Sequence, residues 1–323
     1  MASTRIQLIA PSGYPHHPAA MERGFRRLHD AGCVLGGLDV LKRREQRYAG
    51  TDAERASDLN ALASVPDLPD IVLAVRGGYG ATRVLERLDH ARLRERLAGS
   101  STMLVGHSDF TAVQLALLAR AGLCTFSGPM LGADFGAEVL SEFTWNHFWN
   151  IVRSPTVQLQ WLASSAAELD VEGPLWGGNL AVLCSLIGTP YCPNVDGGIL
   201  YVEDVAEPAF RIERMLYQLH LSGILGRQRA LLLGGFSQCR SSPYDQGYGL
   251  ADGFRQIRAL TRTPLVEGLP IGHVPDKLTL PCGGHARLRV SGGKAELELG
   301  GYPHMQTVGK AAPETLPAKP GHD

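Results

Sequence analysis

The first half of the chain alternates short apolar runs with helix-like stretches, and this alternation constrains the fold more than any other feature. The runs at 6–9, 70–75 and 103–105 have the length and composition of buried strands, and segments of helical character lie at 20–31 and 81–88. Strands that alternate with helices indicate a parallel sheet covered by helices. We therefore expect an α/β domain at the N-terminal end.

The alternation is lost between residues 144 and 167, where aromatic residues crowd together and proline and small residues follow. A chain of 323 residues that is 44% hydrophobic is long enough to form two domains. We place the junction in this stretch. The sequence thus predicts an N-terminal domain over 1–165, a C-terminal domain over 166–310 and a flexible tail over 311–323.

The C-terminal domain, which this junction makes the smaller of the two, contains both strand-like and helical segments. Strand-like runs occupy 197–205 and 231–236, and helical segments occupy 180–187 and 210–220. The alternating segment 286–299 has a Ser-Gly-Gly turn in its middle and predicts a β-hairpin.

Two glycine-rich segments are predicted to be loops. Arg76–Gly80 directly follows an apolar run, and a second segment spans 172–179. Neither has the Gly-x-Gly-x-x-Gly pattern or the Gly-Lys-Ser/Thr ending of known phosphate loops, so no nucleotide cofactor is expected. In open α/β sheets ligands bind beyond the carboxyl ends of the strands, so the first of these loops is expected to border the site.

Charge and composition exclude several classes of partner. The chain has 31 Lys and Arg against 32 Asp and Glu, which gives no net field to attract nucleic acid or an anionic membrane. No run of 18 apolar residues occurs, and the first residues lack the apolar region of a secretory signal. We expect a cytoplasmic protein that acts on a small molecule.

The cysteines and histidines do not suggest a metal site. The six cysteines are scattered without a Cys-x-x-Cys pair, and the eleven histidines form no His-Glu-x-x-His motif. His16, His17 and His285 are the remaining candidate ligands. We expect reduced cysteines, no metal and no cofactor.

Ser108 is the best candidate for a nucleophile. It follows the strand-like run 103–105 and Gly106, and helical spacing resumes after it, so it is predicted to lie on a tight turn at the start of a helix. Helix N-terminal N–H groups can stabilise an oxyanion there. The alternative is that Ser108 or Asp109 only caps the helix.

A serine nucleophile needs a base and a group that orients the base. His273 is favoured as the base because it lies in a loop after an apolar segment, whereas His107 adjoins the serine and His220 ends a helix. Glu203, Asp204 and Glu207 compete as the orienting acid, and surface ion pairing is the alternative for each.

Five separated motifs resemble, in order, those of the L,D-carboxypeptidase family of serine peptidases, and the resemblance extends to about Leu299. The motifs are Arg76–Gly80, Gly106–Thr111, Leu175–Leu180, Val202–Glu207 and Gly272–His273.

The resemblance implies a serine carboxypeptidase that removes the terminal D-alanine from murein tetrapeptides during cell-wall recycling. It implies that Ser108 is the nucleophile, His273 the general base and Glu203 the residue that orients it. It also implies a cleft between an α/β N-terminal domain and a β-rich C-terminal domain, and a homodimer.

Further site residues are expected around the serine. The backbone N–H of Asp109 and that of Gly77 or Gly78 are candidates for the oxyanion hole. Arg76 is a candidate partner for the substrate carboxylate, with a structural ion pair as the alternative.

Trp176 and Asn179 are expected to line the cleft, although packing is an equal alternative for the tryptophan. His107 stands where the family more often has an aromatic or apolar residue, so it is expected to affect the pH profile.

Other functions remain open at this stage. Relatives with the same triad are microcin-immunity peptidases that cleave aminoacyl-nucleotide analogues and hold the base on an aromatic platform in an inserted loop. The motif spacing shows no such insertion. A muropeptide-binding protein with a dead site, and an amidotransferase-like or esterase activity, are the remaining alternatives.

Overall fold

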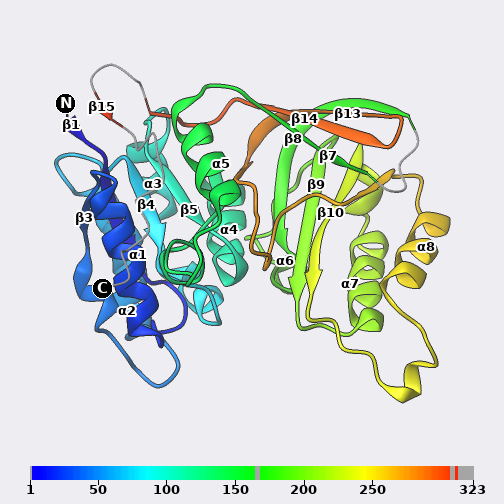
Figure 1. Cartoon of the computed structure of the whole chain (residues 1–323), viewed down its shortest axis with the longest axis horizontal. Coiled ribbons are helices and arrows are strands. Elements are labelled where there is room, and N and C mark those ends of the chain that lie inside the picture. Colours follow the sequence, from blue (N-terminus) through cyan, green and yellow to red (C-terminus); the bar gives the residue numbers. More distant parts are fainter. Residues whose placement is uncertain (1, 164–167, 306–309, 312–323) are drawn as a thin grey trace.

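The protein has two large sheets side by side, each with its own set of helices (Figure 1), and a third sheet of only two strands, β1 (Ala2–Ser3) and β15 (Lys310–Ala311). The computed structural model describes residues 2–163, 168–305 and 310–311. The mixed α/β class with two domains is confirmed. Most of the predicted tail, residues 312–323, lies outside the described residues.

The N-terminal sheet has six strands in the order β12-β6-β5-β4-β2-β3. Its five N-terminal strands are parallel, which confirms the prediction from the alternating pattern. Their bounds are β2 (Arg5–Ile9), β3 (Val34–Gly36), β4 (Ile71–Ala74), β5 (Met103–Gly106) and β6 (Thr125–Ser127). The sixth strand, β12 (Leu280–Cys282), comes from the other half of the chain and is antiparallel to β6.

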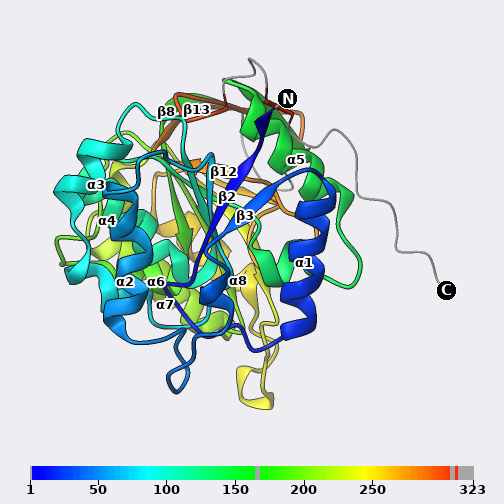
Figure 2. The same cartoon turned by 90° about the vertical axis from the view of Figure 1, so that its left-hand side faces the viewer.

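Helices cover both faces of this sheet: α1 and α5 lie on one side, and α2, α3 and α4 on the other (Figure 2). Their bounds are α1 (Pro18–Asp30), α2 (Asp52–Asn60), α3 (His90–Leu97), α4 (Thr111–Ala121) and α5 (Glu142–Arg153).

Two local predictions in this half need correction. The segment expected as a helix at 81–88 is a 3₁₀ helix, η3 (Ala81–Arg87). The aromatic stretch expected to be irregular is helix α5, whose start is capped by the Ser141 side chain. Its aromatic residues are buried because Trp145, Phe148 and Trp149 follow helical spacing toward the core.

The C-terminal sheet has seven strands in the order β11-β10-β9-β8-β13-β14-β7. The strands are β7 (Val157–Leu162), β8 (Leu169–Asn179), β9 (Ile199–Val205), β10 (Ala230–Ser237), β11 (Leu265–Glu267), β13 (Gly284–Ser291) and β14 (Lys294–Gly300). Strands β8 to β11 are parallel, and the predicted hairpin forms β13 and β14.

Strand β8 replaces the loop that the glycines at 172–179 predicted. At Gly177, φ is 143°, and a Cβ there would lie 1.8 Å from the carbonyl oxygen of Tyr201. Glycine is therefore needed here because two paired strands approach closely, and it does not mark a flexible loop. Strand β7 also pairs in this sheet, so the C-terminal sheet begins before the predicted junction at 165.

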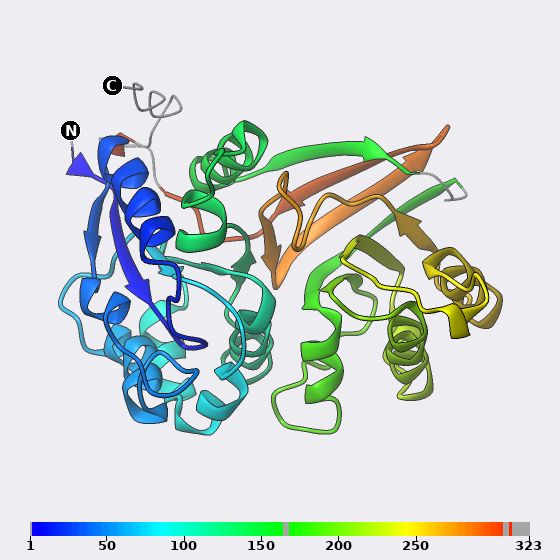
Figure 3. The same cartoon turned by 60° about the horizontal axis from the view of Figure 1, so that its bottom comes forward.

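Helices α7 (Ala209–Leu221) and α8 (Leu250–Leu260) pack together on one side of this sheet, and the shorter α6 (Leu180–Leu186) follows β8 (Figure 3). Two buried apolar clusters each include residues of both domains. Apolar packing is therefore continuous across the domain boundary. Within the described residues, no helix has the length and apolar character needed to cross a membrane.

Candidate active site

Ser108 lies on a strained turn at the carboxyl end of β5. Its φ is 61°, in the left-handed region that a non-glycine residue seldom adopts. The short 3₁₀ helix η4 (Ser108–Phe110) starts here and runs into α4. A Cβ on Gly106 would lie 2.7 Å from the Phe110 ring, so the turn requires glycine at that position. The predicted strand–turn–helix around Ser108 is confirmed.

The Arg76–Gly80 loop packs directly against this serine. A Cβ on Gly77 would lie 2.8 Å from Ser108 Oγ and 3.4 Å from the backbone nitrogen of Asp109. The carboxylate of Asp109 accepts a 2.8 Å hydrogen bond from the Ala81 N–H, which ties the turn to the segment after the loop. Burial raises the pKa of Asp109. Thus Ser108, Asp109 and Gly77 lie together, as the sequence predicted for neighbouring strand ends.

His273 and Glu203 form a hydrogen-bonded pair in the C-terminal domain. His273 Nδ1 lies 2.8 Å from Glu203 Oε2, and Glu203, in β9, is only 3% exposed. Burial alone would raise the pKa of Glu203, but the hydrogen bond and the charge of His273 hold it below its usual range. A Cβ on Gly272 would lie 2.5 Å from Glu203 Oε2, so glycine allows the histidine loop to reach the acid.

The other two candidate acids have structural partners. Asp204 Oδ2 accepts a 2.9 Å hydrogen bond from the Ala181 N–H at the start of α6. Glu207 pairs with Arg211 one helical turn later, at 3.0 Å. The geometry therefore favours Glu203 over both as the group that orients His273.

Contacts across the domain boundary bring the serine turn and the histidine loop together. The rings of His107 and His273 meet edge to face, with centroids 5.3 Å apart. The side chain of Thr111, in the first turn of α4, accepts a 3.0 Å hydrogen bond from the Asn179 N–H at the end of β8. The residue before Ser108 and the helix after it thus both contact the C-terminal domain.

Arg76 lies half-buried beside the loop that contacts Ser108. Its guanidinium donates to the Tyr14 carbonyl at 3.0 Å and to His16 Nδ1. Burial lowers the pKa of Arg76. Within the described residues no carboxylate forms an ion pair with this guanidinium.

Trp176 does not line a cleft, whereas Asn179 lines a small cavity beside Glu203 and Gly272. Trp176 has no exposed surface, and its indole N–H donates to Gln228 Oε1 at 2.9 Å within the core. The Asn179 amide donates to Glu203 at 3.2 Å and to Asp204 at 3.1 Å. Packing thus explains the tryptophan, and the asparagine holds the carboxylates of Glu203 and Asp204 beside this cavity.

Sequence reasoning missed a buried ion pair behind the two histidines. Lys277 Nζ contacts Asp134 Oδ1, and Asp134 also accepts a 2.7 Å hydrogen bond from the Met130 N–H. The partners are 143 positions apart, so no local pattern could reveal them. The spacing of Lys277 four residues after His273 was the only available hint.

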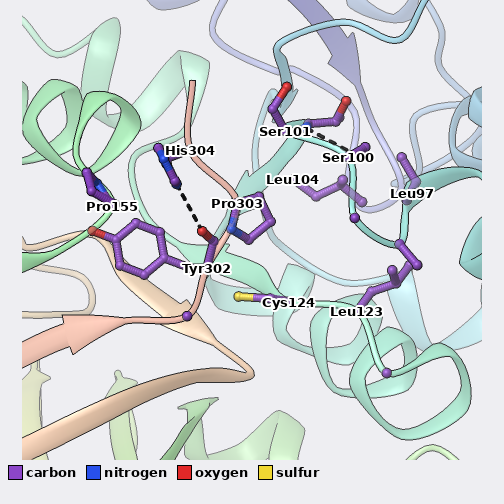
Figure 4. A pocket seen from close by; sticks show the side chains of 15 residues that line it. Leu97, Ser100, Ser101, Leu104, Leu123, Cys124, Pro155, Tyr302, Pro303 and His304 are labelled. Carbon is purple, nitrogen blue, oxygen red and sulfur yellow. Dashed lines mark hydrogen bonds between the residues drawn. The ribbon is translucent and has the colours of Figure 1, made fainter. Parts of the chain in front are cut away.

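A cavity of about 540 Å³ lies at the opposite end of β5 and is not a competing site (Figure 4). Its walls include Leu104, Cys124, Tyr302 and His304, and the described residues that line it include no Asp, Glu, Lys or Arg. Among the described residues that line it, no histidine is hydrogen-bonded to a serine or a cysteine. In the described part of the chain, no group of three or more His, Cys, Asp and Glu is arranged to hold a metal ion.

Comparison with known proteins gives a consistent result. The family model of the LD-carboxypeptidase N-terminal domain matches residues 6–128, and that of the C-terminal domain matches residues 172–288. A putative carboxypeptidase of Streptomyces coelicolor is 36% identical over 311 residues, which cover 91% of this chain and 93% of the relative.

A solved structure and a second relative extend this result. The crystal structure of muramoyltetrapeptide carboxypeptidase from Oxalobacter formigenes has a TM-score of 0.86 and 44% identity, and the match covers 93% of this chain and all of that one. The microcin C7 self-immunity protein MccF of Escherichia coli is 28% identical over 296 residues, which cover 81% of this chain and 83% of MccF.

Proposed function

Because this chain belongs to the LD-carboxypeptidase family, we propose that it is a serine-type L,D-carboxypeptidase that removes the terminal D-alanine from murein tetrapeptides. We place this activity in the cytoplasmic recycling of cell-wall peptides. One observation carries the proposal: His273 Nδ1 is hydrogen-bonded to the buried Glu203 at 2.8 Å, and the same histidine ring contacts the residue that precedes Ser108.

The pairing with Glu203 defines the chemical role of His273. A carboxylate accepts, so Nδ1 carries the proton and Nε2 has the free lone pair of a general base. Ser108 Oγ attacks the carbonyl carbon of the L-configured residue, and His273 takes the serine proton. It then passes that proton to the amine of the departing D-alanine. Water attacks the acyl-enzyme in the second half of the reaction and regenerates Ser108.

Backbone N–H groups next to Ser108 are proposed to stabilise the oxyanion. The Asp109 nitrogen begins the helical turn after the serine, and Gly77 lies against the serine hydroxyl. The N–H of Asp109 and that of Gly77 or Gly78 are the donors that we assign. Donors fixed in this way contribute about 3 kcal/mol each to transition-state stabilisation in related chemistry.

Arg76 is proposed to bind the carboxylate of the leaving D-alanine. It is half-buried beside the Gly77 loop and its described contacts are to a carbonyl and an imidazole, which leaves the positive charge unneutralised. A substrate with an amidated or extended terminus would leave this guanidinium unpaired and should be rejected.

A second candidate is an immunity-type peptidase that cleaves aminoacyl-nucleotide analogues, since MccF matches most of the chain. The two candidates share the same proposed triad and differ in what binds the leaving group. The Arg76 guanidinium, which donates to the Tyr14 carbonyl and to His16, suits an anionic leaving group of either kind, because arginine pairs with carboxylates and with phosphates.

The proposal is tested by incubating the purified protein with murein tetrapeptide, with the corresponding pentapeptide and with an aminoacyl-nucleotide analogue. Mass detection should show tripeptide and free D-alanine from the tetrapeptide alone. Ser108→Ala is the matched control for trace contaminants. Binding without turnover would indicate a muropeptide-binding protein, and equal trimming of the pentapeptide would contradict the specificity claim.

A further inference from the structure

His107, Asp134 and Lys277 form a buried polar group that the proposed mechanism does not use. Their exposed fractions are 6%, 9% and 4%. The Lys277 ammonium pairs with Asp134, and His107 Nδ1 lies 3.0 Å from the Gly128 carbonyl and 3.7 Å from Asp134 Oδ2. Charged groups are seldom this deeply buried, and an apolar replacement is often at least as stable. The arrangement therefore needs a reason other than stability.

This group joins the two domains at the histidine loop. His107 and Asp134 belong to the N-terminal domain, whereas Lys277 follows His273 by four residues. Thr144 of α5 strengthens the junction, because its hydroxyl donates to the Pro275 carbonyl at 3.0 Å and accepts from the Lys277 N–H at 2.9 Å. The segment that carries His273 is thus fixed to the domain that carries Ser108.

The orientation of the His107 ring is determined by its partner. A carbonyl only accepts, so His107 Nδ1 must carry a proton and donate to Gly128. Burial, together with the nearby charge of Lys277, lowers the pKa of His107 to about 4, so the ring is neutral near pH 7. A neutral ring at this position adds no positive charge beside the imidazolium that forms on His273.

We propose that His107 is a positioning residue: its ring packs edge to face on His273 and keeps that base aligned between Glu203 and Ser108, while the Asp134–Lys277 pair fixes the segment that follows His273 to the N-terminal domain. The main evidence is the contact between the two rings, whose centroids lie 5.3 Å apart at an interplanar angle of 75°. This inference rests on the proposed function, because it requires His273 to activate Ser108.

The test measures how fast a fluorophosphonate labels Ser108, since this reaction needs the activated serine but not the peptide substrate. His107→Gln keeps a polar side chain but loses the ring, and His107→Phe keeps the ring but loses the hydrogen bond. We expect labelling of His107→Gln to be slower by about tenfold or more, and that of His107→Phe to stay within about threefold of the unmodified protein. With murein tetrapeptide, kcat should fall in the same proportion and KM should not.

His90→Ala is the matched control. His90 is only partly buried, but like His107 it bonds to a backbone carbonyl, that of Leu85 at 3.1 Å, and its loss should leave labelling unchanged. Equal rates in His107→Gln and His107→Phe, whether both normal or both slow, would overturn the inference. If the unmodified protein is not labelled at Ser108, the proposed function fails instead.

A second variant covers the case in which either His107 substitution prevents folding. The double variant Asp134→Asn, Lys277→Met removes the ion pair without leaving a charge buried. It should slow labelling by about threefold or more, because the segment that carries His273 loses its ion pair with the N-terminal domain. An unchanged rate in a folded double variant would overturn the inference.

Discussion

The two domains contribute to the candidate site by different physical means. In the N-terminal domain, the backbone conformation of Ser108 itself positions its side chain: φ is 61° on a turn between β5 and α4. In the C-terminal domain, Glu203 occupies a regular position in β9, and His273 reaches it across 70 positions of sequence through one hydrogen bond.

The contrast explains why one half of the site is easier to recognise than the other. A strained turn needs glycine and apolar residues at fixed offsets, so it leaves a local pattern in the sequence. A base and its acid need only meet in the fold, and any acidic residue near a strand end is a candidate beforehand. The nucleophile therefore depends on local strain, and the base depends on long-range contacts.

The largest expected effect is that of Ser108→Ala. The hydroxyl supplies the covalent step but little buried surface, so kcat should fall by at least about a thousandfold while the protein stays folded. Steady-state kinetics with murein tetrapeptide, together with a thermal melt, check this. Near-normal turnover by the folded variant would remove Ser108 from the mechanism.

Glu203→Gln should have the next largest effect. An amide cannot stabilise the imidazolium of His273, so kcat should fall about a hundredfold to a thousandfold, which is less than for Ser108→Ala. Asp204→Asn and Glu207→Gln are matched controls because each removes one neighbouring charge, and their melting temperatures report any structural loss. A severe effect of either control on kcat, with Glu203→Gln near normal, would reassign the orienting acid.

The same contrast explains how much could be predicted. Strands β2, β4 and β5 were predictable because each is an apolar run that ends at a turn. The turn at Ser108 and its proximity to Gly77 followed from the same pattern and from the rule that parallel strands share one ligand-binding edge. The choice of Glu203 over its neighbours came from the family resemblance and not from the spacing.

In other segments, contacts between residues far apart in the sequence determine the structure, and local composition predicts it wrongly. The glycines of β8 suggested a loop, but Gly177 is needed because Tyr201 of the neighbouring strand approaches it closely. Trp176 looked like a cleft residue and is instead bonded to Gln228, which lies 52 positions away. The loss of the strand–helix alternation predicts no helix at α5. Trp145, Phe148 and Trp149 nevertheless have helical spacing, which the neighbouring aromatic residues obscure.

His107 in the N-terminal domain and Glu203 in the C-terminal domain should change the free energy of unfolding in different pH ranges. The folded-state pKa of His107, about 4, is below its ordinary value of 6.5, so its contribution to stability is complete above pH 6.5 and is lost as the pH falls toward 4. The loss corresponds to roughly 3 kcal/mol. The pKa of Glu203 is lowered from its ordinary value of 4.5, so this carboxyl group changes the free energy of unfolding only below about pH 4.5.

Urea unfolding between pH 4 and pH 7 checks this difference. His107→Phe should flatten the fall in the free energy of unfolding between pH 6.5 and pH 4. Glu203→Gln should change the dependence only at the acidic end of that range. Identical slopes for His107→Phe and the unmodified protein would show that His107 does not titrate as a buried neutral group.

Gly77→Ala tests whether the close approach to the serine matters. The new Cβ would lie 2.8 Å from Ser108 Oγ, so the serine must move and kcat should fall by about tenfold. Gly99→Ala, in a turn where a Cβ meets nothing within 4 Å, is a control for the loss of a glycine and should affect stability but not kcat. Unchanged kcat in Gly77→Ala would mean that the loop can withdraw from the serine.

The smallest expected effect measures the strain itself. Ser108 and Ala206 both have φ of 61°, and Ala206 lies three residues after Glu203, so each domain has a non-glycine left-handed residue at or within three positions of a proposed triad residue. A residue with a Cβ in this conformation costs about 1–2 kcal/mol, and the greater flexibility of unfolded glycine offsets part of that cost. Ser108→Gly should therefore be more stable than Ser108→Ala by about 1 kcal/mol, and Ala206→Gly should gain a similar amount.

Ala119→Gly, on the exposed side of α4, should instead lose about 1 kcal/mol, because its backbone is helical. Urea unfolding of the four variants measures these differences. A gain at Ala206 without one at Ser108 would mean that the serine turn is held without strain, and the contrast between the two domains would then rest on hydrogen bonding alone.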